Sequence, residues 1–294
     1  MMKWRDFDDY MDQMGWGSAR ENVKREWFEH EGERLAVDMF LAGEDSPVIL
    51  FHHGIAVYPR LYWPFLNRMR ELGYSSVAPT RKGHGHSSGR RGDCTIEESV
   101  EVARAALAWI KERFSGPYLM MGSSLGGYIT VAALSAGVEV DAAACHNAIH
   151  PESAPLFYQR TLLAMARPLL RLLPDNRCID IRHVISFRGV TDDRDLYKLV
   201  DTDDLIAWRY TLRALRSIVT FKPPRPYSAI KTPTMFVVGE RDPMIPPGYM
   251  KKVFGKLTCK KRFEVLPGAG HMLPLEYLDP FVQTVDKWFN ECLC

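Results

Sequence analysis

The sequence lacks several features that would point to particular classes of protein. No apolar run is long enough to cross a bilayer, and the acidic, aromatic start of the chain does not look like a secretory signal. The net charge is only +2 over 294 residues, which argues against a nucleic-acid partner. None of the six cysteines forms a C-x-x-C pair, so zinc and thioredoxin-like motifs are absent. We therefore expect a cytoplasmic globular protein without a membrane span.

Short apolar strands and helical segments alternate along most of the chain. A hairpin is expected over residues 24–41, turning at Glu31-Gly32. A capping box, Thr95 with Glu98, predicts a helix that runs to about Arg113. Further strands are expected at 47–52, 76–79, 118–121, 140–145, 234–239 and 262–266, and further helices at 62–72 and 278–289. This alternation predicts a mostly parallel, doubly wound α/β sheet.

The alternation breaks between about residues 150 and 228. This stretch has a helical period and no convincing buried strand, with one apolar face at Leu162–Leu173 and a second helix expected from Asp203 to about Ile218. We interpret residues 150–228 as a helical cap inserted into a core formed by 1–149 and 229–294. The alternative is that these are ordinary helices flanking the sheet.

A candidate nucleophile lies between an apolar strand and a helix of small residues. Residues 119–127 contain Gly122-x-Ser124-x-Gly126, and the two glycines allow strand and helix to approach closely. A serine on such a sharp turn holds its hydroxyl clear of the sheet edge. Ser123 is a rival nucleophile, but it stands one place early for the turn and is expected to bond locally. These features favour Ser124.

Two later strands also end in groups that a nucleophilic serine needs. Asp242 follows the strand at 234–239, and His271 follows the strand at 262–266. His271 would take the proton of Ser124, and Asp242 would stay ionised and orient the imidazole. Taken singly, Asp242 could cap a turn before Pro243 and His271 could be a loop histidine. The chain order Ser, Asp, His instead favours a catalytic triad at the carboxyl ends of parallel strands.

An oxyanion that forms at this serine needs two hydrogen-bond donors. The backbone N–H groups of Leu125, at the start of the helix, and of Ile55, after the strand at 47–52, are the candidates. The histidines at positions 52, 53, 84 and 86 could suggest a metal, but carboxylate partners are missing nearby. We expect His53 and His84 to hold loops, and we assign neither a metal nor a cofactor.

On these residues the chain resembles the α/β-hydrolase superfamily over nearly its whole length. The run from Gly83 to Gly92 looks like the Gly-His-Gly-x-Ser-x-Gly loop of monoacylglycerol lipases and bacterial lysophospholipase-like hydrolases. The oxyanion loop, nucleophile turn, acid turn and histidine turn are similar too. The chain departs from many relatives just before Gly-His-Gly, where Thr80-Arg81-Lys82 stands instead of a run with an acidic residue.

The resemblance implies a serine hydrolase with an α/β-hydrolase fold and a cap that shapes an acyl pocket. We expect cleavage of carboxylic esters with small to medium hydrophobic acyl groups, such as monoglycerides, through an acyl-enzyme on Ser124. Thioesters, amides, aminopeptidase substrates or an activated carbon–carbon bond are alternatives, because the same triad can cleave them. A hydrolase fold that only binds its ligand is a further alternative, which the intact triad disfavours.

Overall fold

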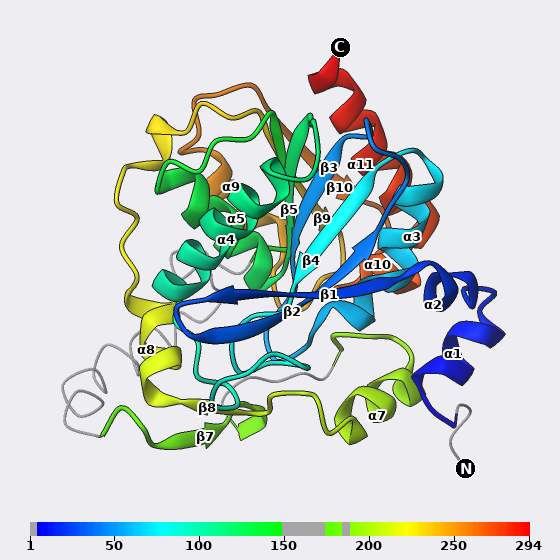
Figure 1. Ribbon diagram of the computed structural model, residues 1–294, viewed down its shortest axis with the longest axis vertical. Helices are drawn as coiled ribbons and strands as arrows, with labels where there is room; N and C mark the ends of the chain where they lie inside the picture. The colour runs from blue at the N-terminus through cyan, green and yellow to red at the C-terminus, as the bar shows by residue number, and fades with distance from the viewer. Residues whose placement is uncertain (1–4, 149–173, 184–188) are drawn as a thin grey trace.

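The computed structural model describes residues 5–148, 174–183 and 189–294. Its centre is a twisted eight-stranded sheet in the order β1-β2-β4-β3-β5-β6-β9-β10 (Figure 1). Neighbouring strands in the order β4-β3-β5-β6-β9-β10 pair in parallel. At the other edge, β2 pairs antiparallel with both β1 and β4. Their bounds are Lys24–His30 (β1), Glu33–Phe40 (β2), Val48–His52 (β3), Ser75–Pro79 (β4), Tyr118–Ser123 (β5), Ala142–His146 (β6), Thr234–Gly239 (β9) and Lys261–Leu266 (β10). The predicted mostly parallel sheet is confirmed.

The expected edge hairpin is confirmed as well. Strands β1 and β2 pair from Lys24 opposite Met39 to His30 opposite Glu33. The turn between them places Glu31 at φ 49° and Gly32 at φ 78°. Positive φ at both central residues is the geometry that joins twisted strands through a two-residue turn, and a glycine at the second position tolerates it.

Helices cover both faces of the sheet because its strands are apolar on both sides. Ile49 and Phe51 of β3 pack with the helices of one face, and Leu50 between them packs with those of the other. Figure 1 shows these two layers. The first face carries α3 (Trp63–Glu71), α10 (Leu273–Glu276) and α11 (Leu278–Leu293), and the second carries α4 (Ile96–Lys111), α5 (Leu125–Ser135) and α9 (Pro247–Phe254).

Shorter elements complete the core. Helix α1 (Phe7–Gln13) lies beside α7 (Arg194–Thr202), and α2 (Ser18–Asn22) lies beside α3 (Figure 1). Short 3₁₀ turns occur at Pro59–Tyr62 and Tyr227–Ala229. Among the described helices, none combines the length and the apolar character needed to cross a membrane.

The segment predicted as a helical cap contains strands as well as helices. Strand β7 (Cys178–Asp180) pairs antiparallel with β8 (Arg209–Thr211), a 3₁₀ turn follows β7 at Ile181–His183, and α8 spans Leu212–Thr220. The predicted helix from Asp203 to Ile218 is therefore wrong for residues 203–211 and confirmed for residues 212–218, which lie in α8. The expectation of no buried strand is wrong, because Tyr210 in β8 is fully buried. The predicted apolar face at Leu162–Leu173 lies outside the described residues. The boundaries 150 and 228 remain a prediction.

Tertiary contacts explain why residues 203–211 are not helical. The Asp203 carboxylate accepts a hydrogen bond from the Leu205 N–H at 2.8 Å, which stabilises a turn. The Ala207 N–H donates to the carbonyl oxygen of Ala56 at 2.9 Å, so this backbone group bonds to the core instead of to a helix. These bonds outweigh the weak helical preference of the local sequence.

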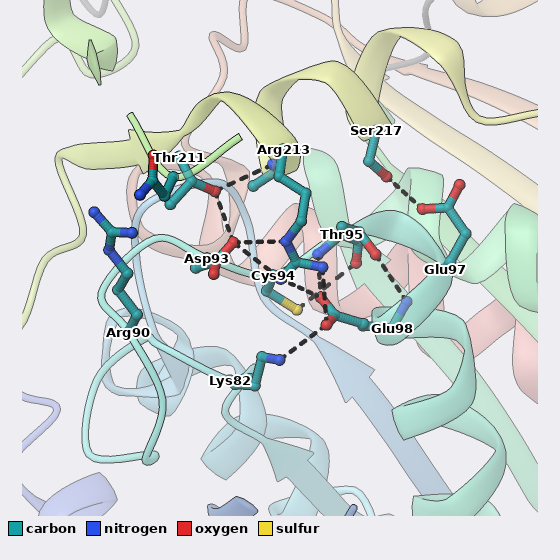
Figure 2. Close-up of polar contacts among 12 residues, drawn as sticks. Lys82, Arg90, Asp93, Cys94, Thr95, Glu97, Glu98, Thr211, Arg213 and Ser217 are labelled. Atoms are coloured by element: carbon teal, nitrogen blue, oxygen red, sulfur yellow. Dashed lines mark hydrogen bonds and ion pairs between the residues drawn. The ribbon is translucent and has the colours of Figure 1, made fainter. Parts of the chain in front are cut away.

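A polar network joins α8 and β8 to the core (Figure 2). The Arg213 guanidinium donates to Asp93 Oδ1 at 3.0 Å and to both carboxylate oxygens of Glu98, at 3.0 and 3.2 Å. The Ser217 hydroxyl donates to Glu97 Oε2 at 2.6 Å, also at the start of α4. The segment therefore contacts the core beside the Gly-His-Gly loop, through charge-assisted hydrogen bonds that are only partly exposed.

Candidate active site

Ser124 lies on a strained turn between β5 and α5. Its backbone has φ 56° and ψ −115°, a combination that side-chain-bearing residues rarely adopt and that costs about 1–3 kcal/mol. A Cβ on Gly122 would lie 2.1 Å from the carbonyl oxygen of Gly126, and one on Gly126 would lie 1.9 Å from that of His52. Only glycine fits at these two places, as the sequence predicted. The turn leaves the Ser124 side chain at the carboxyl edge of the sheet.

Ser123, the rival nucleophile, is engaged elsewhere. Its hydroxyl lies 2.8 Å from Nδ1 of His146, at the end of the neighbouring strand β6. Burial and the nearby His271 lower the pKa of His146 to about 3, so its imidazole is neutral at neutral pH. The contact crosses from one strand to the next, so the expected local bond of Ser123 is replaced by a cross-strand one.

The structure brings Asp242 and His271 together, as the sequence predicted. His271 Nδ1 lies 2.8 Å from Asp242 Oδ2, and both side chains are buried. The other carboxylate oxygen, Oδ1, accepts backbone N–H bonds from Met244 and Ile245 at 2.8 and 2.9 Å. Burial alone would raise the pKa of Asp242, but the charge and hydrogen bond of His271 and the two N–H groups hold it below the usual value. An ionised Asp242 keeps the proton on Nδ1 and leaves Nε2 as the basic nitrogen.

Asn147 fixes the histidine loop and was not identified from the sequence. Its amide Nδ2 donates to the His271 carbonyl oxygen at 2.9 Å, and its Oδ1 accepts from the Gly239 N–H at 3.3 Å. Its backbone has φ 41°, in the left-handed region that asparagine tolerates better than most residues. A short polar residue directly after a buried strand was the available signal.

Ser124 and His271 open onto the same cavity. No hydrogen bond joins their side chains within the described part of the chain; catalytic hydrogen bonds often tighten only in the complex with substrate. The described lining is mostly apolar and contains no carboxylate. Besides Met244 and Met272, it includes Ile55, Leu61, Val190, Leu196, Val200 and Trp208. The cavity therefore offers a polar reacting end and an apolar wall.

The loop that carries Ile55 passes directly beside Ser124. A Cβ on Gly54 would lie 3.5 Å from Cβ of Ser124 and 2.8 Å from the Tyr62 hydroxyl oxygen. The N–H of Gly54 donates to the Tyr62 hydroxyl at 3.1 Å, and that of Ala56 donates to the Tyr210 hydroxyl at 2.9 Å. These two bonds fix the peptides on either side of the Ile55 N–H.

One candidate oxyanion donor belongs to a residue that lines the cavity, and the other belongs to the residue directly after Ser124. Ile55 lines the cavity, and its N–H makes no hydrogen bond within the described ranges. Leu125 is the first residue of α5, where a helical N–H has no intrahelical partner and the helix dipole favours negative charge. The arrangement can therefore accept a negatively charged oxygen beside the Ser124 hydroxyl.

The Gly-His-Gly histidine holds this loop through the β7–β8 segment. His84 Nδ1 lies 2.9 Å from the Lys82 carbonyl oxygen, to which it can only donate, so Nε2 accepts from the Tyr210 hydroxyl at 2.6 Å. Burial, and then the charge of Arg81, lower the pKa of His84 well below its usual value. Tyr62 and Tyr210 were not identified from the sequence, because each contacts the loop only in the folded chain.

Within the described ranges, no group of three or more histidine, cysteine, aspartate or glutamate side chains could hold a metal ion. His53 and His84 hold loops, as expected from the sequence. His53 Nε2 accepts a hydrogen bond from the Arg81 N–H at 3.1 Å, and both nitrogens of His84 are occupied by the contacts above.

Solved structures of other hydrolases share this fold. A soluble variant of monoglyceride lipase from Saccharomyces cerevisiae, in complex with a substrate analog, is 16% identical with a TM-score of 0.77, covering 92% of this chain and 96% of that one. The monoacylglycerol lipase of Paleococcus ferrophilus is 19% identical (TM-score 0.70, covering 92% and 99%). A thermostable carboxyl esterase from Bacillus coagulans, in complex with glycerol, is 15% identical (TM-score 0.76, covering 92% and 99%). At such identities the likeness establishes the fold alone.

Sequence comparison establishes the family. No curated protein matches the chain. Residues 43–277, well over half of the chain, match the family described as serine aminopeptidase, S33. The chain therefore belongs to the S33 serine aminopeptidase family of the α/β-hydrolase superfamily.

Proposed function

We propose that the protein is a serine hydrolase that cleaves carboxylic esters through an acyl-enzyme on Ser124. One observation carries the proposal: His271, which is hydrogen-bonded to Asp242, lines the same apolar cavity as Ser124, a serine on a strained turn. Nucleophilic acyl transfer uses every part of this arrangement, because it needs an acid that orients an imidazole and a serine hydroxyl at the same cavity.

The first half of the proposed reaction forms the acyl-enzyme. Ser124 Oγ attacks the ester carbonyl carbon while His271 Nε2 takes the hydroxyl proton, and Asp242 stabilises the imidazolium. The carbonyl oxygen becomes an oxyanion that accepts from the N–H groups of Ile55 and Leu125. The tetrahedral intermediate then collapses, the carbon–oxygen bond to the leaving alcohol breaks, and His271 returns the proton to that alcohol.

The second half releases the acid. A water molecule attacks the acyl carbon as His271 Nε2 accepts one of its protons, and a second oxyanion forms in the same hole. Collapse of this intermediate breaks the bond to Ser124 Oγ, which recovers its proton from His271. Atoms and charge balance without a metal or cofactor, so the proposal needs none.

The substrate class follows from the cavity wall. A neutral acyl chain gains free energy by leaving water for the apolar side chains described above, at roughly 25 cal/mol per Å² of buried apolar surface. We propose small to medium hydrophobic acyl esters, including monoglycerides. The lipase and esterase structures named above share the fold and make this class a reasonable first choice.

An aminopeptidase would need a carboxylate to hold the substrate ammonium group. Asp193 instead caps α7 by accepting from the N–H groups of Asp195 and Leu196. Asp203 accepts from the Tyr58 hydroxyl and the Leu205 N–H. These two acids take part in local structure and do not line the described cavity. The cavity therefore gives no support to amine substrates, although the family is described as a serine aminopeptidase family.

A substrate panel tests the proposal. p-Nitrophenyl esters of increasing acyl length, monoglycerides, acyl thioesters and aminoacyl arylamides would be compared with the wild type and with Asp242→Asn. We expect the esters to have the highest kcat/KM and Asp242→Asn to lose several orders of magnitude in turnover. Faster cleavage of the arylamides or thioesters would contradict the proposed bond type, and full activity in Asp242→Asn would contradict the proposed acid.

A further inference from the structure

Arg81 is a buried cation at the edge of the candidate site. It follows β4 by one residue, Thr80, and is only 5% exposed. Within the described residues, no carboxylate lies within 4.0 Å of its guanidinium nitrogens. A buried charge without a counter-ion is costly, so an arginine here calls for a physical explanation.

The guanidinium group donates to the loop that carries Ile55. Nη2 of Arg81 donates to the carbonyl oxygen of Gly54 at 2.7 Å. His53 Nδ1 lies 3.0 Å from the same oxygen. The backbone N–H of Arg81 donates to His53 Nε2, so the imidazole hydrogen is on Nδ1 and that nitrogen donates to Gly54. The Gly54 carbonyl therefore accepts two hydrogen bonds, one of them from a cation.

This carbonyl belongs to the same peptide group as the Ile55 N–H. Hydrogen bonds to a peptide oxygen polarise the whole group and make its N–H a stronger donor, and a charged donor has the larger effect. Ile55 lines the cavity that contains Ser124, and its N–H makes no hydrogen bond among the residues that the structure describes. A negative charge that develops there is stabilised by the polarised peptide and by the fixed positive charge behind it.

We propose that Arg81 is a positioning residue that acts through the Gly54–Ile55 peptide to strengthen the Ile55 N–H as an oxyanion donor. The inference rests on the proposed function, because it requires an acyl-transfer oxyanion. The negative charge that compensates the buried guanidinium is then the oxyanion, which forms in the transition state and is absent from the resting enzyme. Electrostatic stabilisation of this kind lowers the barrier without tightening substrate binding.

A purely structural role for Arg81 makes a different prediction. The peptides that flank the Ile55 N–H are also held by Tyr62 and Tyr210, so the loop has anchors besides Arg81, of which Tyr210 itself interacts with the Arg81 side chain. If Arg81 only supported the loop, its loss would misplace cavity residues and raise KM. If it polarises the peptide, kcat falls while KM holds, and another cation at this position restores part of the rate.

The test measures kcat and KM for p-nitrophenyl butyrate, and Ki for an alkyl trifluoromethyl ketone, whose serine adduct carries an oxyanion. The variants of the full chain are Arg81→Met, Arg81→Gln and Arg81→Lys. Arg70→Met is the matched control, because Arg70 Nε also donates to a backbone carbonyl, that of Leu41, away from the cavity.

We expect Arg81→Met and Arg81→Gln to lower kcat about tenfold or more, below the 10²- to 10³-fold loss of a whole oxyanion donor. KM should stay within about twofold, and Ki should rise by about the same factor as kcat falls. Arg81→Lys should recover at least half of the lost rate on a logarithmic scale, and Arg70→Met should match the wild type.

Unchanged kcat in Arg81→Met, or a loss that appears only in KM, overturns the proposal. If Arg81→Met does not fold, the comparison of lysine with glutamine decides, and a glutamine variant as fast as the lysine variant overturns it. If the wild type cleaves esters and the Arg81 variants have the same kcat, only the proposed role of Arg81 is refuted. A wild type that cleaves no ester and forms no ketone adduct refutes the proposed function together with it.

Discussion

Removal of the Tyr210 hydroxyl tests whether the β7–β8 segment supports the candidate oxyanion loop. This hydroxyl accepts from the Ala56 N–H at 2.9 Å and donates to His84 Nε2 at 2.6 Å, and the side chain is fully buried. Tyr210→Phe leaves both of these groups without a partner in a region that water does not reach. Each buried unsatisfied group costs about 1–3 kcal/mol, so we expect a loss of about 2–4 kcal/mol in the free energy of unfolding after some relaxation.

Urea denaturation measures this loss directly. The midpoint should fall while the m-value stays constant, because the surface exposed on unfolding does not change. For a chain of this size the same loss lowers Tm by roughly 4–8 °C. Turnover should fall as well, by about tenfold, because Ala56 follows the proposed oxyanion donor Ile55 and its N–H loses its anchor.

Tyr118→Phe is the matched control for this measurement. The Tyr118 hydroxyl donates to the Phe114 carbonyl oxygen at 2.6 Å on a half-buried side chain outside the cavity. Water can replace that bond, so the expected loss is within about 1 kcal/mol, with unchanged turnover. If Tyr210→Phe loses no more free energy than Tyr118→Phe, the bridging role of the Tyr210 hydroxyl is refuted.

Two further predictions concern the turn at Ser124 and the network in Figure 2. Gly126→Ala places a Cβ 1.9 Å from the His52 carbonyl oxygen, so it should lower the free energy of unfolding by more than about 4 kcal/mol or prevent folding. The control is Gly248→Ala in α9, whose Cβ meets nothing within 4 Å and should be neutral or slightly stabilising. Circular dichroism melts measure both. Burial raises the pKa of Glu98, but hydrogen bonds from Lys82, the Thr95 N–H and Arg213 outweigh it and hold the pKa at about 2 instead of 4.5. The stabilisation by this lowered pKa is complete above about pH 4.5 and disappears as the pH falls toward 2. In urea titrations, the wild type should therefore exceed Glu98→Gln in free energy of unfolding at about pH 4.5 and lose this excess as the pH falls toward 2. An excess that does not change with pH would contradict the assignment.

Much of the fold could be predicted because its signals are local. The capping box before α4 forms as expected, since Thr95 and Glu98 exchange both hydrogen bonds at 2.8 and 3.1 Å. The buried strands are continuous apolar runs, and the turn at Ser124 is determined by two glycines within five residues. Each of these features depends on side chains that are close together in the sequence.

The support of the site could not be predicted because its contacts join distant parts of the chain. Tyr210 is separated from Ala56 by 154 residues and from His84 by 126 residues. The same contacts draw residues 203–211 away from the helix that their local pattern suggested. The periodicity of a sequence cannot predict a contact between such distant residues. Asn147 differs, because a polar residue directly after a buried strand is a local signal. The expected cytoplasmic location stays a prediction.

The central claim is that the Ser124 hydroxyl becomes a nucleophile because His271 removes its proton. The most direct measurement is labelling with a fluorophosphonate probe, with the modified peptide identified by mass spectrometry and ester turnover followed in parallel. We predict that the wild type is labelled at Ser124, that Ser124→Ala is not labelled, and that Ser124→Ala and His271→Ala each lose on the order of 10⁴-fold in turnover. A label on Ser123, or an unlabelled wild type that still hydrolyses esters, would contradict the account.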